Sequence, residues 1–131
     1  MTYKPKETYD FQADLRVGKV GEALVKNYLY EESVDVEVKT DVKWKKTGNL
    51  YIEDKFWSQV HGDVPGGFKT TEADVWAFVM GKCVLWVPYD TLSRAVDKWG
   101  EEAKCTNSEN PSEGRLITPG QILQMEMRRP A

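Results

Sequence analysis

Two segments of this 131-residue chain alternate apolar and polar residues with a period of two, and this alternation constrains the fold most strongly. Residues 34–41 separate Val34, Val36 and Val38 from Asp35, Glu37, Lys39 and Asp41. Residues 50–55 separate Leu50 and Ile52 from Tyr51, Glu53 and Lys55. Because successive side chains of a strand point to opposite faces, both segments are predicted to be strands with one apolar and one charged face.

The residues between these segments predict how the two strands pair. The intervening WKKTGN sequence, residues 44–49, ends in glycine and asparagine, which tolerate the positive φ of tight turns. A turn there would join the strands into a hairpin whose charged faces coincide, because cross-strand neighbours share a face. The expected neighbours are Asp41 with Tyr51 and Lys39 with Glu53.

The rest of the chain predicts helices around further strands. An apolar stripe behind a potential N-cap at Asp14 indicates a helix over residues 14–30, with Val17, Val20, Leu24 and Tyr28 on one side. We then expect a loop at 58–69 and a short helix from Thr70 or Thr71. Two buried strands separated by Gly81 and Lys82 should follow, and then a helix at 90–99. The last elements expected are a strand and a short helix within 115–129. This order is typical of an α/β domain, here a helix followed by a central mixed sheet flanked by helices.

Size and charge limit the classes of protein to which the chain can belong. Its 15.0 kDa suggest one domain, which we divide into a polar lead-in at 1–13, a core at 14–99 and an extension at 100–131 that could carry an interface. A net charge of −3 excludes a generally basic nucleic-acid binder, so any contact with nucleic acid needs local basic patches or bound metal ions.

The cysteines and the apolar segments indicate a compartment. Cys83 and Cys105 form no Cys-x-x-Cys pair, so a zinc site is not expected, and Cys83 is predicted to be a buried free thiol. The N-terminus carries no apolar signal segment, and no apolar run approaches the ~20 residues that span a membrane. We therefore expect a cytoplasmic protein that has no membrane contact.

The charged faces have the composition of a phosphodiester-cleaving site. Such sites need a hard metal ion held by carboxylates and waters, and a lysine that positions the attacking water or stabilises the transition state. Asp41, Glu53 and Lys55 supply two carboxylates and a lysine on adjacent predicted strands. Glu53 and Lys55 are two residues apart and are therefore expected to project from the same side.

These residues resemble the Asp…(Asp/Glu)-x-Lys motif of the PD-(D/E)XK nuclease superfamily, which includes restriction enzymes, Holliday-junction resolvases and phage endonucleases. Asp41, a turn and Glu53-Asp54-Lys55 carry the resemblance, and GKVGEALVKNYL resembles the opening helix of the resolvases. Its Glu22 would match the additional glutamate of their metal site. The resemblance covers residues 14–99 and depends on short motifs.

The resemblance implies a fold, a reaction and a cofactor. It implies a restriction-endonuclease-like core and a Mg²⁺- or Mn²⁺-dependent deoxyribonuclease, resolvase-like or phage-encoded, which would then act in the host cytoplasm. Asp41, Glu53 and Glu22 would hold the metal, and Lys55 would position the attacking water. A homodimer, or a partner that binds DNA, is expected because so small a domain offers little surface for DNA.

Two departures leave a second assignment open. Thr40 stands where the family has proline, and Asp54 stands where the middle of the triplet is apolar. Residues 35–39 contain another triplet, Glu37-Val38-Lys39, whose middle is apolar, although no strand precedes it to supply the aspartate. In the favoured assignment Glu37 and Lys39 are close neighbours of the site, and Lys39 could also take the role of the catalytic lysine.

Other residues are candidates for DNA contacts. A basic turn with one aromatic ring could clamp a phosphate and stack on a base; it consists of Lys43, Trp44, Lys45 and Lys46. Lys69 and Thr70 could meet a phosphate near the start of the expected short helix. The plainer interpretation of the turn is an exposed loop that confers solubility, and His61 is expected to be solvated.

Two plainer functions compete with a nuclease. The charged faces are also compatible with a solvated surface whose cross-strand ion pairs contribute well under ~1 kcal/mol each. The chain would then be a non-catalytic nucleic-acid- or protein-binding module on the same fold, and it would bind without metal. A small-molecule-binding domain is a third hypothesis, but the sequence has no phosphate loop or cofactor motif.

Overall fold

The computed structural model describes residues 15–16, 18–20, 22–23, 34–41, 43–106 and 111–130. The chain divides into two compact units, Met1–Val34 and Asp35–Ala131, and each is described by itself. The described residues between 15 and 23 are helical and exposed, as expected within 14–30. All the strands and helices discussed below belong to the second unit.

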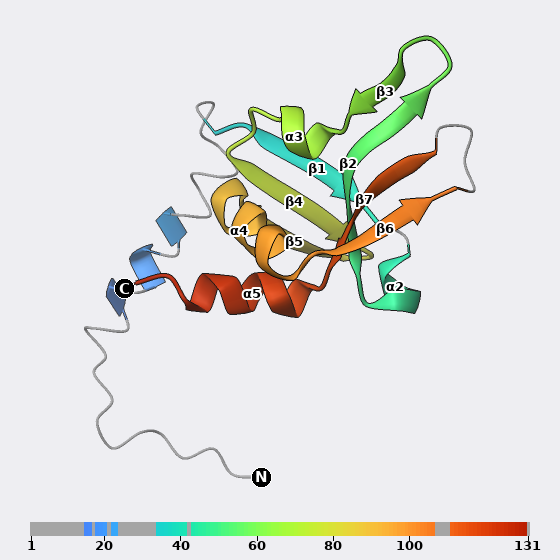
Figure 1. The fold of residues 1–131 in the computed structure, drawn as a ribbon. Helices are drawn as coiled ribbons and strands as arrows, with labels where there is room; N and C mark the ends of the chain where they lie inside the picture. Colours follow the sequence, from blue (N-terminus) through green and yellow to red (C-terminus); the bar gives the residue numbers. More distant parts are fainter. Residues whose placement is uncertain are drawn as a thin grey trace. The chain divides into compact units, whose positions relative to one another are not determined.

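The second unit contains two β-sheets (Figure 1). In the three-stranded sheet β1 runs parallel to β4, and β4 is antiparallel to β5; the strands are β1 (Val36–Thr40), β4 (Val75–Met80) and β5 (Cys83–Pro88). The four-stranded sheet is antiparallel in the order β3 (Gly62–Pro65), β2 (Leu50–Ser58), β7 (Ser112–Ile117) and β6 (Glu101–Cys105). The chain is therefore an α/β protein, but it has two sheets instead of the one central sheet expected.

Helices connect and cover the sheets. They are α2 (Trp44–Thr47), α3 (Gly67–Thr70), α4 (Tyr89–Trp99) and α5 (Pro119–Met127). A capping box begins α5: Thr118 Oγ1 accepts from the Gln121 backbone N–H, and the Gln121 side chain accepts from the Thr118 backbone N–H. Helices α4 and α5 lie side by side (Figure 1). Among the described residues, no helix has the length and apolar character needed to cross a membrane.

One hydrophobic core joins the two sheets to these helices. The four-stranded sheet contributes Leu50, Ile52 and Ile117, the three-stranded sheet contributes Trp76, Phe78 and Val87, and α4 and α5 contribute Leu92, Val96, Ile122 and Met125. Burial of these side chains provides the main favourable free energy of folding. Since the core includes residues from β7 and α5, residues 100–131 form part of the same unit as β1 and β2.

The predicted hairpin between residues 34–41 and 50–57 is wrong. β1 pairs with β4 and β2 pairs with β3 and β7, so the two strands belong to different sheets. The helical turn α2 separates them, and Gly48, with a φ of 72°, ends it. An alternating pattern specifies which residues share a face of a strand, but it does not specify the partner strand.

Of the other elements predicted from the sequence, some are confirmed and some are wrong. The hairpin around Gly81, the helix at 90–99 and the strand and helix near the C-terminus are confirmed as β4–β5, α4, β7 and α5. The expected loop at 58–69 instead contains β3 and most of α3, and Thr71 ends α3 instead of beginning a helix. Cys83 is exposed, because it begins β5 directly after the turn, so the expected burial of its thiol is wrong.

Gly114 of β7 permits a close backbone contact beside β2. A Cβ atom at this position would lie only 2.2 Å from the backbone oxygen of Ile52. We predict that Gly114→Ala lowers the free energy of unfolding by about 1–3 kcal/mol, because the two strands must separate to accept the methyl group. Gly120→Ala is the control, since its Cβ would meet nothing nearer than 3.8 Å. Urea unfolding measures both, and equal stabilities would contradict the close contact.

Candidate active site

A β-bulge at Asp54 decides which face of β2 each charged side chain occupies. Glu53 pairs with Gly114 of β7 whereas Lys55 pairs with Glu113, so Asp54 is an extra residue. Paired residues of antiparallel strands project to the same face, and the consecutive Glu113 and Gly114 belong to opposite faces. Glu53 and Lys55 therefore lie on opposite faces of the sheet. The expectation that they share a face is wrong, because the bulge shifts the alternation by one residue.

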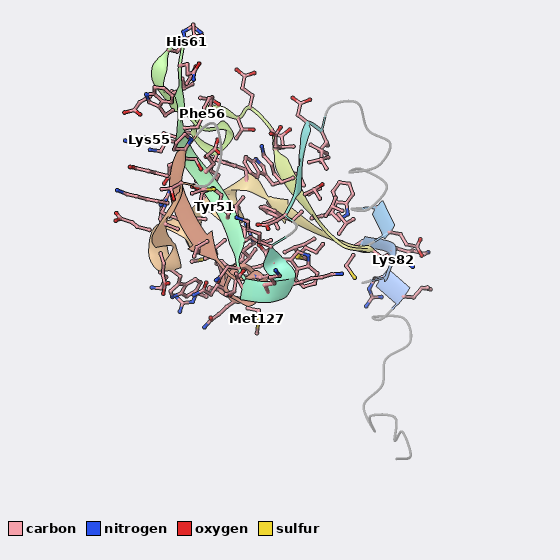
Figure 2. The ribbon with its side chains drawn as sticks, turned by 90° about the vertical axis from the view of Figure 1, so that its right-hand side faces the viewer. Tyr51, Lys55, Phe56, His61, Lys82 and Met127 are labelled. Carbon is pink, nitrogen blue, oxygen red and sulfur yellow. The ribbon has the colours of Figure 1, made fainter. Side chains whose placement is uncertain are left out.

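Lys55 belongs to a charged cluster on the face away from Glu53. Its Nζ lies 3.4 Å from Glu113 Oε2 and 3.9 Å from Asp63 Oδ2, and Lys104 Nζ lies 3.7 Å from Glu113 Oε1. These side chains are well exposed, so each pair contributes little to stability. Tyr51 and Lys55 are both labelled on β2 in Figure 2. The lysine of the expected Glu-x-Lys motif thus has partners other than Glu53.

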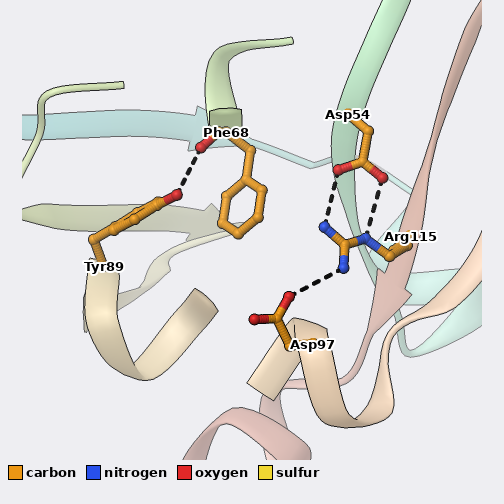
Figure 3. A network of polar contacts seen from close by, with 5 residues as sticks. All are labelled: Asp54, Phe68, Tyr89, Asp97 and Arg115. Carbon is orange, nitrogen blue, oxygen red and sulfur yellow. Dashed lines mark hydrogen bonds and ion pairs between the residues drawn. The ribbon is translucent and has the colours of Figure 1, made fainter. Parts of the chain in front are cut away.

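The side chain of Asp54 explains why an acidic residue stands in the middle of this triplet. Arg115 of β7 donates to both of its oxygens, from Nε at 3.1 Å and from the second terminal nitrogen at 3.0 Å (Figure 3). Arg115 also reaches Asp97 of α4 at 3.4 Å, and its guanidinium lies 5.9 Å from the centre of the Phe68 ring. Asp54 therefore fastens the bulge to β7 and is not a free metal ligand.

Arg115 remains positively charged in this network. Burial lowers the pKa of the guanidinium, but hydrogen bonds and charge interactions with Asp54 and Asp97 raise it by more, so the net shift of the pKa is upward. The Arg115 and Asp54 side chains are each only about one-fifth exposed. A two-pronged arginine–carboxylate bond in such surroundings fixes geometry as well as contributing energy. The bulge therefore has a specific support on the β7 side.

Glu53 lines a cleft of about 180 Å³ whose walls come from both sheets and α3. The cleft is lined by Lys39 of β1, Tyr51 and Glu53 of β2, Gly67 and Phe68 of α3, and Trp76 of β4. A second cleft, of about 350 Å³, shares Gly67 and is lined by Asp35, Val36, Glu37, Thr70, Thr71, Glu72 and Ala73. We call these two adjoining pockets, which share Gly67, the Gly67 cleft. Lys39 and Glu53 are the charged residues of the first pocket, and Asp35, Glu37 and Glu72 are those of the second.

The charged side of β1 is turned toward the core side of its sheet. Glu37 and Lys39 are the register partners of the buried Trp76 and Phe78, whereas Val38 is 61% exposed. Lys39 Nζ lies 3.2 Å from Glu37 Oε1 and 5.5 Å from the centre of the Trp76 ring. Both side chains remain partly solvated, with 45% of the Lys39 side chain and 38% of the Glu37 side chain exposed, so the pair is also compatible with a solvated charged face.

Gly67 lies within contact distance of two of these charges. A Cβ atom there would lie 3.6 Å from Lys39 Nζ and 3.8 Å from Glu37 Oε1, which is ordinary contact. The preceding Gly66 is more constrained: its N–H donates to the Asp54 backbone oxygen at 2.7 Å, and its Cβ would lie 2.5 Å from the Glu53 backbone oxygen. The pair of glycines therefore brings α3 against the bulge.

Tyr51 joins Glu53 on the cleft side of β2. Its hydroxyl lies 2.8 Å from Ser112 Oγ. Burial raises the pKa of the Tyr51 phenol, the Ser112 hydrogen bond lowers it by less, and the negative charge of Glu53 raises it further. Tyr51 is therefore protonated at neutral pH and remains a hydrogen-bond donor in the cleft wall.

The charged residues of the cleft suit a hard cation. Among the described residues, no group of three or more His, Cys, Asp or Glu side chains is arranged to hold a metal ion. Mg²⁺, however, commonly takes one or two carboxylates and completes its coordination with waters and substrate phosphates. Glu37 and Glu53 are carboxylates of that kind beside a lysine, so this donor set fits Mg²⁺ or Mn²⁺ better than a soft metal.

Asp41 and Glu22 are the other two residues that were expected to hold the metal. Asp41 Oδ1 accepts from the Lys43 backbone N–H at 2.9 Å and Oδ2 accepts from the Tyr51 backbone N–H at 3.0 Å, so Asp41 ties the end of β1 to the start of β2. Glu22 is helical and exposed and belongs to the first unit, so its role in the metal site stays a prediction.

The expected DNA contacts divide into two groups. Trp44 packs against the hydrophobic core, while Lys43, Lys45 and Lys46 are exposed around α2, with Lys45 Cε 3.8 Å from where a Cβ of Gly81 would lie. Lys69 is exposed on α3, and Thr70 Oγ1 donates to the Gly66 backbone oxygen at 3.3 Å. Lys69 and Thr70 thus lie within three residues of Gly67, and His61 is exposed at the β2–β3 turn (Figure 2).

Sequence reasoning missed the uncharged walls of the Gly67 cleft. Trp76 falls within one of the two buried strands expected, and Gly67 falls within the expected loop at 58–69. The adjacent glycines Gly66 and Gly67 were a local sign of a close contact, because glycine often marks a place where two backbone segments approach each other. No local signal places Trp76 beside Glu37, since that contact depends on the parallel pairing of β1 with β4.

The proximity of Tyr51 and Glu53 has a consequence for the Tyr51 phenol. The folded protein raises the pKa of Tyr51 above the ordinary value of about 10, so its contribution to stability is complete below that pH and is lost as the pH rises through the folded pKa. Glu53→Gln removes a negative charge and is expected to lower the Tyr51 pKa. Titration by ¹³C NMR of the tyrosine rings measures this shift. Asp63→Asn is the control, and an unchanged pKa in Glu53→Gln would contradict the arrangement.

Comparison of the chain with models of protein families, with curated proteins and with solved structures finds no match. Two carboxylates, Glu37 and Glu53, and the Lys39 ammonium line the pockets that share Gly67.

Proposed function

We propose that this protein is a metal-dependent nuclease that hydrolyses phosphodiester bonds of DNA, of the PD-(D/E)XK type. The observation that carries the proposal is the gathering of Glu37, Lys39 and Glu53 around the Gly67 cleft. Two carboxylates and a lysine from neighbouring strands are the smallest set of residues for this chemistry. The proposal includes a restriction-endonuclease-like core.

Within this proposal the favoured residues differ from the first motif assignment. Lys39 takes the place of Lys55, because Lys55 lies on the opposite face of β2 from Glu53. Glu37 takes the place of Asp41, whose two oxygens accept backbone N–H groups. This combines the Glu37-Val38-Lys39 triplet, with its apolar middle, and Glu53 from β2.

Each charged side chain of the cleft would have its own role in hydrolysis. Glu37 and Glu53 would hold Mg²⁺ or Mn²⁺, which when bound lowers the pKa of water and neutralises charge on the phosphate. The Lys39 ammonium lies 3.2 Å from Glu37 and 5.5 Å from the centre of the Trp76 ring. It would orient the attacking water or stabilise the negative charge that develops in the transition state. The phosphate would bind beside Gly67.

DNA would approach over α3. Lys69 is exposed and Thr70 lies next to it, so the side chains adjoining Gly67 include a positive charge and a hydroxyl. Lys43, Lys45 and Lys46 would contribute phosphate contacts farther along the chain. A homodimer, or a partner protein that binds DNA, would enlarge the small binding surface, and action in the cytoplasm belongs to the same proposal.

A non-catalytic binding module is the second candidate. It is favoured by the Glu37–Lys39 ion pair, which satisfies both charges without any metal. In that case DNA or protein would bind equally well with and without a divalent cation, and neutral residues at 37 and 53 would not weaken the binding. The dependence of binding on metal therefore separates the two functions.

Cleavage assays with matched lysine variants test the nuclease. We expect Mg²⁺-dependent cutting of labelled single-stranded, duplex or four-way-junction DNA. Glu53→Gln and Lys39→Met are expected to reduce the rate by about 100-fold or more, because each removes a charge that acts on the reacting phosphate. Lys55→Met is the matched control and is expected to cleave like the wild type.

Two results would count against this assignment. Loss of cleavage in Lys55→Met with normal cleavage in Lys39→Met would return the catalytic role to the first motif. Absence of metal-dependent cutting on every substrate would favour the binding module. Circular dichroism of each variant establishes that the fold is retained.

A second variant tests whether the Gly67 cleft is the site without changing any charge. Gly67→Leu is expected to abolish cleavage, because its side chain extends toward Lys39 and Glu37 and fills the space for phosphate. Gly67→Ala is the control: its single methyl would make only ordinary contacts, so most of the activity should remain. Full activity of a folded Gly67→Leu variant would exclude the cleft as the site of cleavage.

A further inference from the structure

Strand β5 lies at a sheet edge without the features that usually keep an edge from pairing with another chain. In the described part of the chain, the edge strands are β1 and β5 of one sheet and β3 and β6 of the other. Edges are commonly protected by charged side chains, by proline or by shortness. Three of these edges are protected in this way: β1 contains Glu37 and Lys39, the four-residue β3 contains Asp63 and Pro65, and β6 contains Glu101, Glu102 and Lys104.

The residues of β5 are uncharged from Cys83 to Pro88. Its partner β4 pairs with it over this whole length, and no strand of the described residues pairs with its other side. Val84, near the start of the strand, is 45% exposed. An uncharged edge of this kind can add a further strand through backbone N–H and C=O groups.

The charges that flank β5 favour a second copy of the same strand as its partner. Lys82 precedes β5 and is exposed (Figure 2), and Asp90 follows its end, 3.4 Å from Arg129 but with 68% of its side chain exposed. Antiparallel pairing of two identical strands brings the start of each close to the end of the other. Each Lys82 would then lie near Asp90 of the other copy, whereas parallel pairing would bring like charges together. Between these ends, neither strand presents a charge to the other.

Pro88 limits the register of such a pair. Proline has no N–H to donate, so the pairing should stop before it. The longest antiparallel register that leaves Pro88 out uses residues 83–87 and places a two-fold axis at Leu85. Leu85 then opposes itself on the face that packs against the core, and Val84 opposes Trp86 of the second copy on the other face. All of these contacts are between apolar side chains.

We propose that two copies of this chain associate through their β5 strands, paired antiparallel about Leu85, so that the two three-stranded sheets become one continuous sheet. Such a contact closes at two copies, because each copy uses its β5 edge once. The two β1 strands, with Glu37 and Lys39, form the outer edges of the joined sheet. The interface therefore goes beyond the proposed function, and it exists whether or not the Gly67 cleft cleaves DNA.

Sedimentation equilibrium of the full chain over a range of concentrations tests the association. The wild type is expected to approach twice its mass of 15.0 kDa as the concentration rises. Val84→Lys should raise the dissociation constant of the dimer by about 10-fold or more, because it places an unpaired charge against apolar side chains. Val38→Lys is the matched control: it makes the same change at a 61% exposed valine of β1, and it should dimerise like the wild type.

Two results of this measurement overturn the proposal. One is a wild-type chain that stays monomeric at every concentration. The other is an equal effect of the two lysine variants, which would place the contact away from β5. Circular dichroism of both variants establishes that they are folded.

A disulfide tests the register. Leu85→Cys, in a chain that also carries Cys83→Ser and Cys105→Ser, places two thiols opposite each other across the two-fold axis. Opposed residues of antiparallel strands have Cα atoms about 4.5–5.5 Å apart, which a disulfide can bridge. Mild oxidation should therefore produce a covalent dimer on a non-reducing gel. Val84→Cys in the same background is the control and should link far less, since it opposes residue 86. Equal or preferential linking through Val84→Cys, or linking through neither, would overturn the pairing about Leu85.

Discussion

The hydrogen-bonded pair of Asp54 and Arg115 supports the feature on which the rest of the site depends, the β-bulge in β2. Without the extra residue, β2 would place Lys55 on the same face as Glu53 and Tyr51, and the sheet would carry a plain alternation. With it, Glu53 lies on the side of β1 and α3, whereas Lys55 joins Glu113 and Asp63. An acidic residue in the middle of the triplet is needed because Arg115 must be paired where it is largely buried.

The bulge also brings three elements together at one point. The N–H of Gly66 donates to the backbone oxygen of Asp54, so α3 begins directly against the bulge. Gly67 then lies near Lys39 and Glu37 of the other sheet. The Gly67 cleft is therefore a consequence of packing two sheets around a short helical turn, and its charges come from strands that do not pair with each other.

Most of the elements of the second unit could be predicted from local pattern, but the way they assemble could not. Alternation correctly indicated which residues of β1 share a face, and the apolar runs around Gly81 correctly indicated β4 and β5. The partner of β1 could not be predicted, because a parallel pairing with a strand some 35 residues away leaves no short-range signal. The bulge was equally hidden, since it depends on Arg115, 61 positions beyond Asp54.

The candidate site could likewise be predicted in its local residues but not in the way they assemble. Glu37, Lys39 and Glu53 were all recognised as charged residues of strands, and the cleft unites them. Lys55 was preferred to Lys39 because spacing by two implies one face in a regular strand, and the bulge breaks that rule. Trp76 and Gly67 carry no charge and so gave no chemical signal; their contribution comes from burial and from an absent side chain.

The proposed nuclease requires a divalent cation in the Gly67 cleft and not beside Lys55. Titration with Mn²⁺, followed through the indole NMR signals, locates the cation, because the paramagnetic ion broadens signals close to it. We expect the signal of Trp76 to disappear first, while that of Trp57, which lines the pocket containing Lys55, persists, and we expect Glu53→Gln to abolish the effect. Earlier loss of the Trp57 signal, or broadening that Glu53→Gln leaves unchanged, would contradict it.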